Sequence, residues 1–216
     1  MSYKLIIFDW DGTLMDSAAK IVNCMQIAAR ECAVPVPDSE AVGNIIGISL
    51  KPAIMQLFGI SDEFLAERLV NAYKHAFVEQ DATPCPLFDG VPAMLTDLKA
   101  QGRVLTVATG KARRGLDRAW SNTGTGHYFT ASRCADDAES KPSPDMLSQL
   151  LDELAMQPQD AVMVGDTVYD MQMAQALGMD RIGVSYGVHA QVHLEQHHPV
   201  AIVHSIDELH ARLRLP

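Results

Sequence analysis

Four short apolar runs, each followed directly by small or polar residues, limit most strongly what this chain can fold into. The runs are residues 5–8, 104–108, 161–164 and 182–184. Strands buried on both faces of a parallel sheet are continuous apolar runs of this kind, and polar residues begin where such a strand ends. Segments with a helical period accompany them at residues 91–101, 115–122, 144–156 and 170–177. This alternation predicts an α/β fold with a doubly wound, Rossmann-like parallel sheet.

Residues 16–84 interrupt the alternation and predict a second unit. They contain no comparable strand and are typical of several helices, broken at Pro35, Pro37, Pro52 and Gly59. The segment leaves through a stretch rich in Pro and Gly, which is typical of a hinge between two bodies. We therefore expect an α/β core domain of residues 1–15 plus 85–216, and an inserted helical cap domain of residues 16–84 that acts as a lid.

The amino-acid composition limits the classes of molecule that the protein is expected to bind. The chain has 17 Lys and Arg against 27 Asp and Glu, a formal net charge of −10, which disfavours nucleic acid as a partner. It contains neither a run of about 18 apolar residues nor a basic start followed by a long apolar stretch, so we expect no membrane span. The four cysteines form no CxxC pair, which favours a reducing compartment. We expect a soluble cytoplasmic protein, a monomer or homodimer, whose partner is a small metabolite.

Carboxylates cluster at the ends of two of the predicted strands. Asp9 and Asp11 follow the first run two positions apart, so an extended backbone would point both to one side. Asp166 follows the run at 161–164, and Asp170 lies one helical turn further on. Because neighbouring carboxylates repel unless a cation lies between them, and because Mg²⁺ prefers oxygen ligands, the cluster predicts a magnesium site.

Groups that suit phosphate oxygens accompany these acids. Thr109 and Gly110 end the run at 104–108, and they offer a hydroxyl and an exposed backbone N–H. Lys141 precedes the helical segment at 144–156 and offers one ammonium group. These are donors that bind phosphate, so the sequence predicts an anionic substrate at a site where local charge offsets the negative protein.

In order and spacing, these residues resemble the four motifs of the haloacid dehalogenase superfamily, in its phosphatase branch. The DxDGT motif, the strand-end Thr or Ser, the Lys, and the GDxxxD motif match residues 9–13, Thr109, Lys141 and residues 165–170. The resemblance spans about the whole chain. Asp16-Ser17, Gly47 and residues 88–91 are similar to phosphoglycolate phosphatases and related pyrophosphatases with a small helical cap.

The resemblance implies a role for each candidate. Asp9 would attack phosphorus to give an aspartyl-phosphate, and Asp11 would protonate the leaving group and then activate water. Asp9, the Asp11 carbonyl and Asp166 would hold Mg²⁺. Thr109, Gly110 and Lys141 would bind the phosphate oxygens. Asp170 would support the site, either by orienting Lys141 or by binding the metal through water.

Other activities occur on the same scaffold. Dehalogenases and phosphonate hydrolases of this superfamily place a non-acid or a small residue at the position of Asp11, so its carboxylate disfavours both. A β-phosphoglucomutase-like phosphoryl transfer keeps both aspartates and a helical lid, and it stays an alternative. A catalytically silent binding protein on the same scaffold is a second alternative, because a fold does not fix a function.

Two further features of the sequence have no place in the phosphatase mechanism. His189, His193 and His197 have helical i, i+4, i+8 spacing, which invites a zinc or nickel hypothesis, but the neighbouring Gln, Glu and Pro favour an exposed helix or loop. Lys51 lies in the predicted cap, where it is either a substrate contact or a solvated lysine. We expect neither a second metal centre nor a firm role for Lys51.

Overall fold

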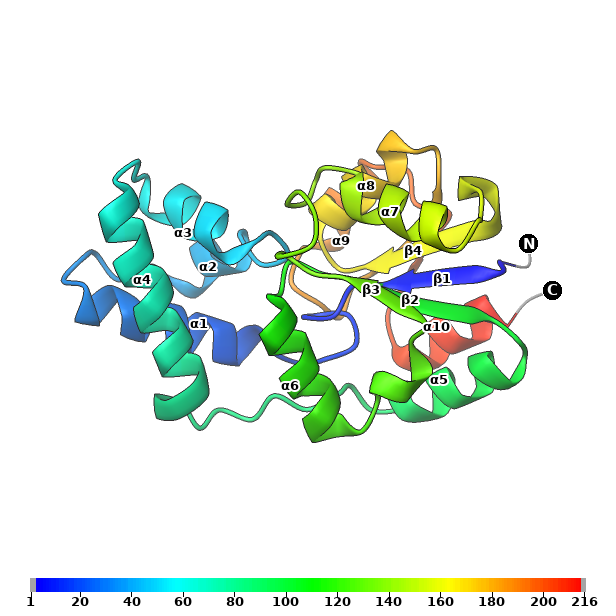
Figure 1. Cartoon of the computed structure of the whole chain (residues 1–216), viewed down its shortest axis with the longest axis horizontal. Coiled ribbons are helices and arrows are strands. Elements are labelled where there is room, and N and C mark those ends of the chain that lie inside the picture. The colour runs from blue at the N-terminus through cyan, green and yellow to red at the C-terminus, as the bar shows by residue number, and fades with distance from the viewer. Residues whose placement is uncertain (1–2, 215–216) are drawn as a thin grey trace.

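A six-stranded, fully parallel sheet forms the centre of the protein (Figure 1). The computed structural model describes residues 3–214. The strand order is β3-β2-β1-β4-β5-β6. The strands are β1 (Leu5–Phe8), β2 (Val104–Ala108), β3 (Ala131–Arg133), β4 (Ala161–Gly165), β5 (Asp180–Val184) and β6 (Ala201–Val203). The predicted fold class and the four predicted strands are confirmed, whereas β3 and β6 were not predicted.

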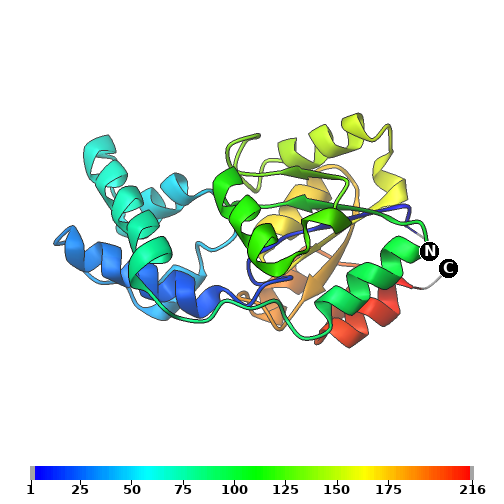
Figure 2. The ribbon, with the colours of Figure 1, turned by 60° about the horizontal axis from the view of Figure 1, so that its bottom comes forward.

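Helices cover both faces of the sheet, which explains why its central strands are apolar on both sides. The helices of the core are α5 (Val91–Ala100), α6 (Arg113–Thr123), α7 (Asp145–Glu153), α8 (Val168–Ala176), α9 (Gln191–Glu195) and α10 (Ile206–Leu213). One hydrophobic cluster joins α5, α6 and α10 to one face, and a second joins α7 and α8 to the other. Figure 2 shows α5 and α10 side by side, near the two termini.

The register of the sheet aligns the ends of the three central strands. Leu5 pairs with both Val104 and Ala161, and Phe8 pairs with both Val107 and Val164. Strand β1 is therefore bordered on each side by a strand that ends at the same level. The residues that follow β1, β2 and β4 lie together at the carboxyl edge of the sheet, where ligands bind in open α/β sheets.

Residues 18–80 consist of helices joined by loops and lie beside this edge, to the left in Figure 1. The elements are α1 (Ala18–Glu31), α2 (Ser39–Gly43), α3 (Leu50–Phe58), α4 (Glu63–His75) and the π-helical turn η1 (Ala76–Gln80). They enclose a hydrophobic cluster of their own. We call residues 18–80 the cap. The division of the chain into two domains at residues 15/16 and 84/85 stays a prediction.

One predicted helix break in the cap is wrong. Pro52 lies inside α3 rather than ending a helix. It occupies the first turn of α3, where a backbone N–H has no intrahelical partner, so the ring removes no hydrogen bond. Gly59 does end α3, in the left-handed conformation at φ 60° that favours glycine.

The two segments that join the cap to the core run side by side. Met15 and Leu87 form an antiparallel bridge, and the Asp16 N–H donates to the carbonyl of Pro86 at 2.8 Å. Lys20 donates to the backbone carbonyl of Asp81 at 2.5 Å, which ties the start of the cap to its end. Both connections therefore leave the core at one place, as in a hinge.

No helix within residues 3–214 combines the length and the apolar character that crossing a bilayer requires. All four cysteines are free, and none lies in a disulfide.

Candidate active site

Three predicted residues meet at the carboxyl edge of the sheet because their strands are neighbours. Asp9 follows β1, Thr109 follows β2, and Asp166 follows β4. All three side chains are almost fully buried, at 0–1% exposure. The Asp9 N–H donates to the carbonyl of Val164 at 2.9 Å, and this bond extends the β1–β4 pairing to the first acid.

Lys141 connects two of the acids. Its Nζ lies 2.7 Å from Oδ1 of Asp9 and 2.6 Å from Oδ1 of Asp170. Lys141 comes from the segment before α7, and its side chain is fully buried. A buried ammonium between two buried carboxylates is held by strong, charge-assisted hydrogen bonds. The lysine therefore has one fixed position beside Asp9.

The buried carboxylates of this cluster carry an unfavourable excess of negative charge. Burial raises the pKa of Asp9 to about 7, against the opposing effect of Lys141. Burial, and then the charges of Asp9 and Asp170, raise the pKa of Asp166 well above its usual value. Burial disfavours the charge of Lys141, but Asp170 and Asp9 raise its pKa overall. One ammonium does not compensate three buried carboxylates, so the site favours a further positive charge.

The backbone approaches Asp166 very closely. Its Oδ1 accepts a hydrogen bond from the Thr13 hydroxyl and its Oδ2 accepts one from the Val188 N–H, each at 2.9 Å. Gly12 has φ 86°, and a Cβ at this position would lie 2.2 Å from Oδ2 of Asp166. The glycine of the first motif is therefore required both by its backbone conformation and by the close approach of the acid.

Asp170 has one structural partner besides Lys141, the N-cap residue Thr167. Helix α8 begins with a capping box: the Thr167 hydroxyl accepts from the Asp170 N–H, and Oδ2 of Asp170 accepts from the Thr167 N–H. The second oxygen, Oδ1, accepts from Lys141. Asp170 thus fixes Lys141 and the start of α8 at once. Thr167 is thus the N-cap of α8.

Asp11 lies at the entrance to the site and contacts a residue that we did not predict. Asp11 is 9% exposed. The Nζ of Lys111 lies 2.9 Å from both carboxylate oxygens of Asp11. Lys111 follows Gly110 directly, so the segment after β2 brings both a phosphate-binding candidate and a cation for Asp11. The contact fixes the orientation of the Asp11 carboxylate.

Thr109 and Gly110 lie between the core and the cap. The Thr109 hydroxyl accepts a hydrogen bond from the Lys111 N–H at 3.2 Å. A Cβ on Gly110 would lie 2.4 Å from the backbone carbonyl oxygen of Gly47 in the cap. The absence of a side chain at Gly110 therefore lets the cap loop that follows α2 rest on the carboxyl edge of the sheet.

The oxygens at the centre of the site fit a hard divalent cation. Carboxylate oxygens of Asp9, Asp166 and Asp170 lie within 4.8 Å of one another, the only such group found in residues 3–214. Oδ2 of Asp9 is buried and has no hydrogen-bond partner. An unpartnered anionic oxygen beside a second carboxylate is the environment that Mg²⁺ requires, since it binds one or two carboxylates and retains water.

The histidines with helical spacing do not form a group. Helix α9 spans only Gln191–Glu195, so His189 and His197 lie outside it. His189 is buried and accepts a hydrogen bond from the Val168 N–H at 3.1 Å, whereas His197 lies near Gln175. Burial lowers the pKa of His189. The histidines belong to different surroundings, which the sequence spacing alone did not reveal.

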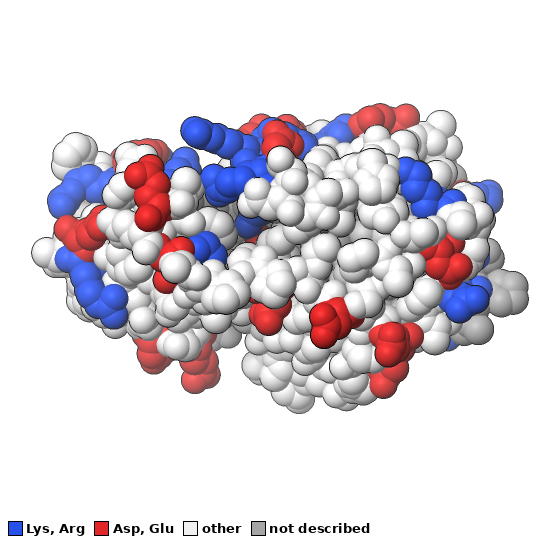
Figure 3. All heavy atoms as spheres, turned by 90° about the horizontal axis from the view of Figure 1, so that it is seen from below, with Lys and Arg blue, Asp and Glu red and all other residues white. Residues whose placement is uncertain are grey.

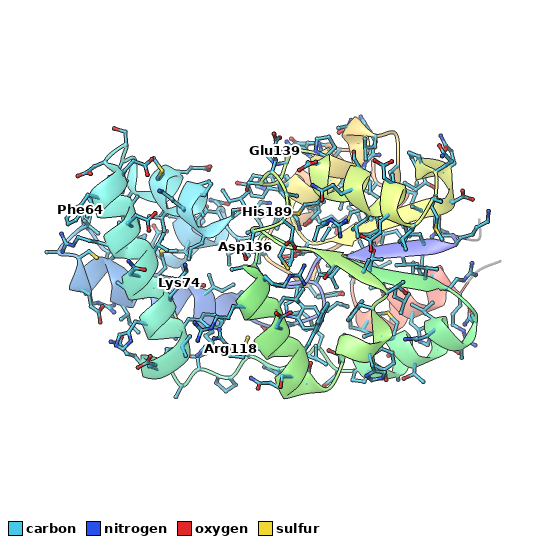
Figure 4. All side chains as sticks on the ribbon, viewed as in Figure 1. Phe64, Lys74, Arg118, Asp136, Glu139 and His189 are labelled. Atoms are coloured by element: carbon cyan, nitrogen blue, oxygen red, sulfur yellow. The ribbon has the colours of Figure 1, made fainter. Side chains whose placement is uncertain are left out.

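Lys51 lies at the wall of the cleft, where two carboxylates neutralise it. Its Nζ forms ion pairs with Glu63 and, at 2.8 Å, with Glu67. Figure 4 shows this part of the cap, with Phe64 pointing away from the core. Lys51 is therefore engaged within the cap.

The site opens into a cleft of ≈950 Å³ between cap and core. Asp9, Asp11, Thr109 and Gly110 line its floor. The cap contributes α3, α4 and η1 to the opposite wall, and the core contributes α6. Ligand sites of about 300–1,000 Å³ hold organic molecules of drug size, so the cleft has room for far more than a phosphate group.

The sequence model described as haloacid dehalogenase-like hydrolase matches residues 6–184 of this chain. The chain belongs to this family. The match includes every residue that the motifs singled out, and the predicted resemblance is confirmed.

Curated relatives align with nearly the whole chain. The probable phosphatase IndB of Dickeya dadantii is 35% identical over 98% of this chain and 95% of its own length. The tyrosine-protein kinase PtkA of Mycobacterium tuberculosis is 32% identical over 98% of this chain and 73% of its own length. The phosphoglycolate phosphatase of Psychrobacter arcticus is 28% identical over 92% of this chain and 90% of its own.

Solved structures agree with this assignment. A predicted phosphatase from Clostridium acetobutylicum superimposes with a TM-score of 0.88 and 29% identity, over 99% of both chains. The enzyme class predicted from the motifs, a phosphoric monoester hydrolase of the phosphatase branch, is confirmed by these matches.

Two residues at the site escaped prediction from sequence. Lys111 contacts Asp11, and Thr13 donates to Asp166. Thr13 belongs to the first motif, so a signal was present. Lys111 had a weaker signal, its place directly after Thr109 and Gly110, because a single lysine there is equally consistent with a surface position.

Proposed function

We propose that this phosphatase hydrolyses a small organic phosphate monoester in two steps, with Asp9 as the nucleophile. In the first step an Asp9 oxygen forms a bond to phosphorus while the bond from phosphorus to the leaving oxygen breaks. Asp11 gives its proton to that oxygen, and the alcohol leaves. An aspartyl-phosphate then connects Asp9 to the phosphoryl group.

The second step regenerates the enzyme. Asp11 takes a proton from a water molecule, the water oxygen bonds to phosphorus, and the bond from Asp9 to phosphorus breaks. Inorganic phosphate is released. The contact between Lys111 and Asp11 supports the role of Asp11 in this second step, because it holds the ionised carboxylate in one orientation at the entrance to the site. Positioned acid–base catalysis of this kind contributes about 10²- to 10⁴-fold in rate.

Asp9, Asp166 and the Asp11 backbone carbonyl would hold Mg²⁺, which when bound offsets the negative charge between the nucleophile and the phosphate. Thr109, the Gly110 N–H and Lys141 would bind phosphate oxygens. Asp170 would hold Lys141 in place.

The observation that carries the proposal is the environment of Asp9. Lys141 binds its Oδ1, and its Oδ2 is buried with no hydrogen-bond partner, at the floor of an open cleft. A structural aspartate is expected to have both oxygens satisfied, because a buried unpaired polar atom is destabilising. The unpaired oxygen supports a role toward a metal or a substrate.

The test is phosphate release from a panel of esters. The panel includes 2-phosphoglycolate, sugar phosphates, pyrophosphate and a haloacid, each with Mg²⁺ and with chelator. Wild type is compared with Asp9→Asn and with Asp152→Asn, a matched change at an exposed residue of α7. We expect release that requires both Mg²⁺ and Asp9. Acid-quenched wild type should carry a phosphoryl group by mass spectrometry, and Asp9→Asn should not.

The same assay separates the alternatives. Phosphate release that survives Asp9→Asn contradicts the mechanism. A phosphorylated Asp9 that passes its group to a sugar or protein hydroxyl instead of water favours a phosphotransferase, and the PtkA relative supports including a tyrosine peptide among the acceptors. A protein that is never phosphorylated and releases nothing favours a silent scaffold.

A further inference from the structure

The wall of the cleft opposite Asp9 has two distinct chemical characters. The cap contributes apolar side chains, namely Ile21, Met25, Ile46, Val70, Tyr73 and Phe77. The rim carries three basic side chains, Lys74 on α4 and Arg114 and Arg118 on α6. Figure 4 labels Lys74 and Arg118, which come from the helices on either side of the cleft. Figure 3 shows basic side chains gathered where cap and core meet.

The three basic side chains have no close carboxylate partner in the described part of the chain. None forms an ion pair with a carboxylate within residues 3–214. In a chain of net charge −10, cations gathered at one cleft without acidic partners need an explanation.

The carboxylates that share this wall are already engaged. Glu67 binds Lys51 at 2.8 Å. Glu79 lies 3.5 Å from His75. Asp136 accepts a hydrogen bond from the backbone N–H of Arg113. Among the basic side chains that line the outer cleft, Lys74, Arg114 and Arg118 are therefore the ones without a close carboxylate in residues 3–214, and they lie apart from the buried acids at its floor.

Phe77 links the apolar and the basic parts. Its ring centroid lies 5.1 Å from Nζ of Lys111 and 5.9 Å from Cζ of Arg118. Tyr73 lies beside it, with ring centroids 5.9 Å apart. Phe77 belongs to the π-helical turn η1, and such turns occur frequently at functional sites. An aromatic surface beside two core cations offers a ligand both a ring contact and a counter-charge.

We propose that the ester cleaved at Asp9 has an apolar, ring-sized body and a second anionic group, and that Lys74, Arg114 and Arg118 bind this second anion. The proposal rests on the hydrolytic function above and specifies its substrate class. The body packs against Tyr73 and Phe77. A two-carbon ester such as 2-phosphoglycolate leaves most of the ≈950 Å³ cleft unfilled.

Two esters that differ by one charge test the anion site. N-acetyl-O-phosphotyrosine and its C-terminal amide have the same leaving phenol, and only the first has a remote carboxylate. We expect the carboxylate form to have a kcat/KM about two- to fivefold higher, as for ion pairs at a partly exposed site. High salt should reduce the ratio, because it screens these charges.

Matched variants test which residues cause the preference for the carboxylate ester. The double variant Arg114→Gln/Arg118→Gln should bring the ratio of the two esters close to one. Arg68→Gln is the control, because Arg68 is an exposed arginine of α4 that does not line the cleft. It removes the same type of charge and should leave the ratio unchanged. An equal loss of preference in Arg68→Gln would attribute the ratio to net charge and overturn the assignment.

Binding to Asp9→Asn separates this inference from the hydrolytic proposal, since it needs no turnover. By calorimetry, N-acetyl-O-phosphotyrosine should bind at least tenfold more tightly than N-acetyl-O-phosphoserine, because only the former buries a ring. It should also bind more tightly than its amide. If the acid and the amide are hydrolysed equally well and bind equally tightly, the anion site is overturned. The hydrolytic function is unaffected by that result. A binding preference without hydrolysis by wild type supports the substrate class and overturns the hydrolytic function.

Discussion

Replacing Asp9 with Asn should make the metal-free protein more stable at neutral pH, although it removes the proposed nucleophile. Burial raises the pKa of Asp9 from 3.8 to about 7. A carboxyl group with a raised pKa keeps its proton in the folded state after the unfolded chain has lost its own. Stability therefore falls as the pH rises from about 4 to about 7. Asn at this position has no proton to lose.

The size of the stability difference between wild type and Asp9→Asn follows from the difference between the folded and unfolded pKa values of Asp9. A shift of about 3 pKa units corresponds to about 4 kcal/mol, at about 1.4 kcal/mol per unit. For a chain of this length, about 4 kcal/mol corresponds to about 8–16 °C in Tm. Lys141 does not contribute to this slope, because its pKa is raised from an already high value and it is charged throughout the interval. Asp166 has a raised pKa and acts in the same direction as Asp9.

Urea unfolding in chelator, at pH values from 4 to 8, measures the difference. The free energy of unfolding of wild type should fall relative to that of Asp9→Asn by about 4 kcal/mol across the interval. Added Mg²⁺ should restore wild type, by about 2.7 kcal/mol at a hundred times its Kd, and should have little effect on the variant. Parallel pH curves for the two proteins would refute the electrostatic reasoning. Asp152→Asn controls for the change in net charge.

Three further predictions follow from single contacts. Lys111→Met removes the ammonium that contacts both oxygens of Asp11, and kcat for alkyl esters should fall about ten- to hundredfold. The loss should be smaller for 4-nitrophenyl phosphate, whose leaving group needs no proton, and equal losses would contradict the role. Gly110→Ala introduces a methyl group against the Gly47 carbonyl, so KM should rise and hydrogen exchange in residues 44–49 should accelerate. Trp10→Ala, at a fully buried ring beside Trp120, should cost about 3–5 kcal/mol in urea unfolding, and a cost below about 1 kcal/mol would mean that the ring is not packed as described.

The central sheet was predictable because its strands are buried on both faces. Apolar runs such as residues 5–8 and 161–164 therefore stand out from their surroundings. The edge strands β3 and β6 have only three residues each, and β3 has the sequence Ala-Ser-Arg, with no fully buried position. Pairing with a neighbouring strand defines these edges, and that information lies outside the local sequence.

The site was predictable where residues follow a strand directly, and less so where a long side chain reaches across the fold. Asp9, Thr109 and Asp166 are positioned by the ends of β1, β2 and β4. Lys111 is different, because its role depends on meeting Asp11, which is 100 positions away. The basic side chains of the cleft could not be predicted as a group for the same reason. Lys74 lies in the cap and Arg118 in the core, and only folding brings both to one cleft.

The paired segments at Met15 and Leu87 have a consequence for how such a protein can change. The chain enters and leaves the cap at one point of the core. The cap is therefore topologically one long insertion, and the core holds its two ends together. Replacing residues 18–80 with another helical unit would leave the strand order and the catalytic edge unchanged, provided that the two ends remain adjacent. Such an exchange would replace the apolar wall that Tyr73 and Phe77 contribute to the cleft, while Arg114 and Arg118 on α6 and the acids at the carboxyl edge stayed in place.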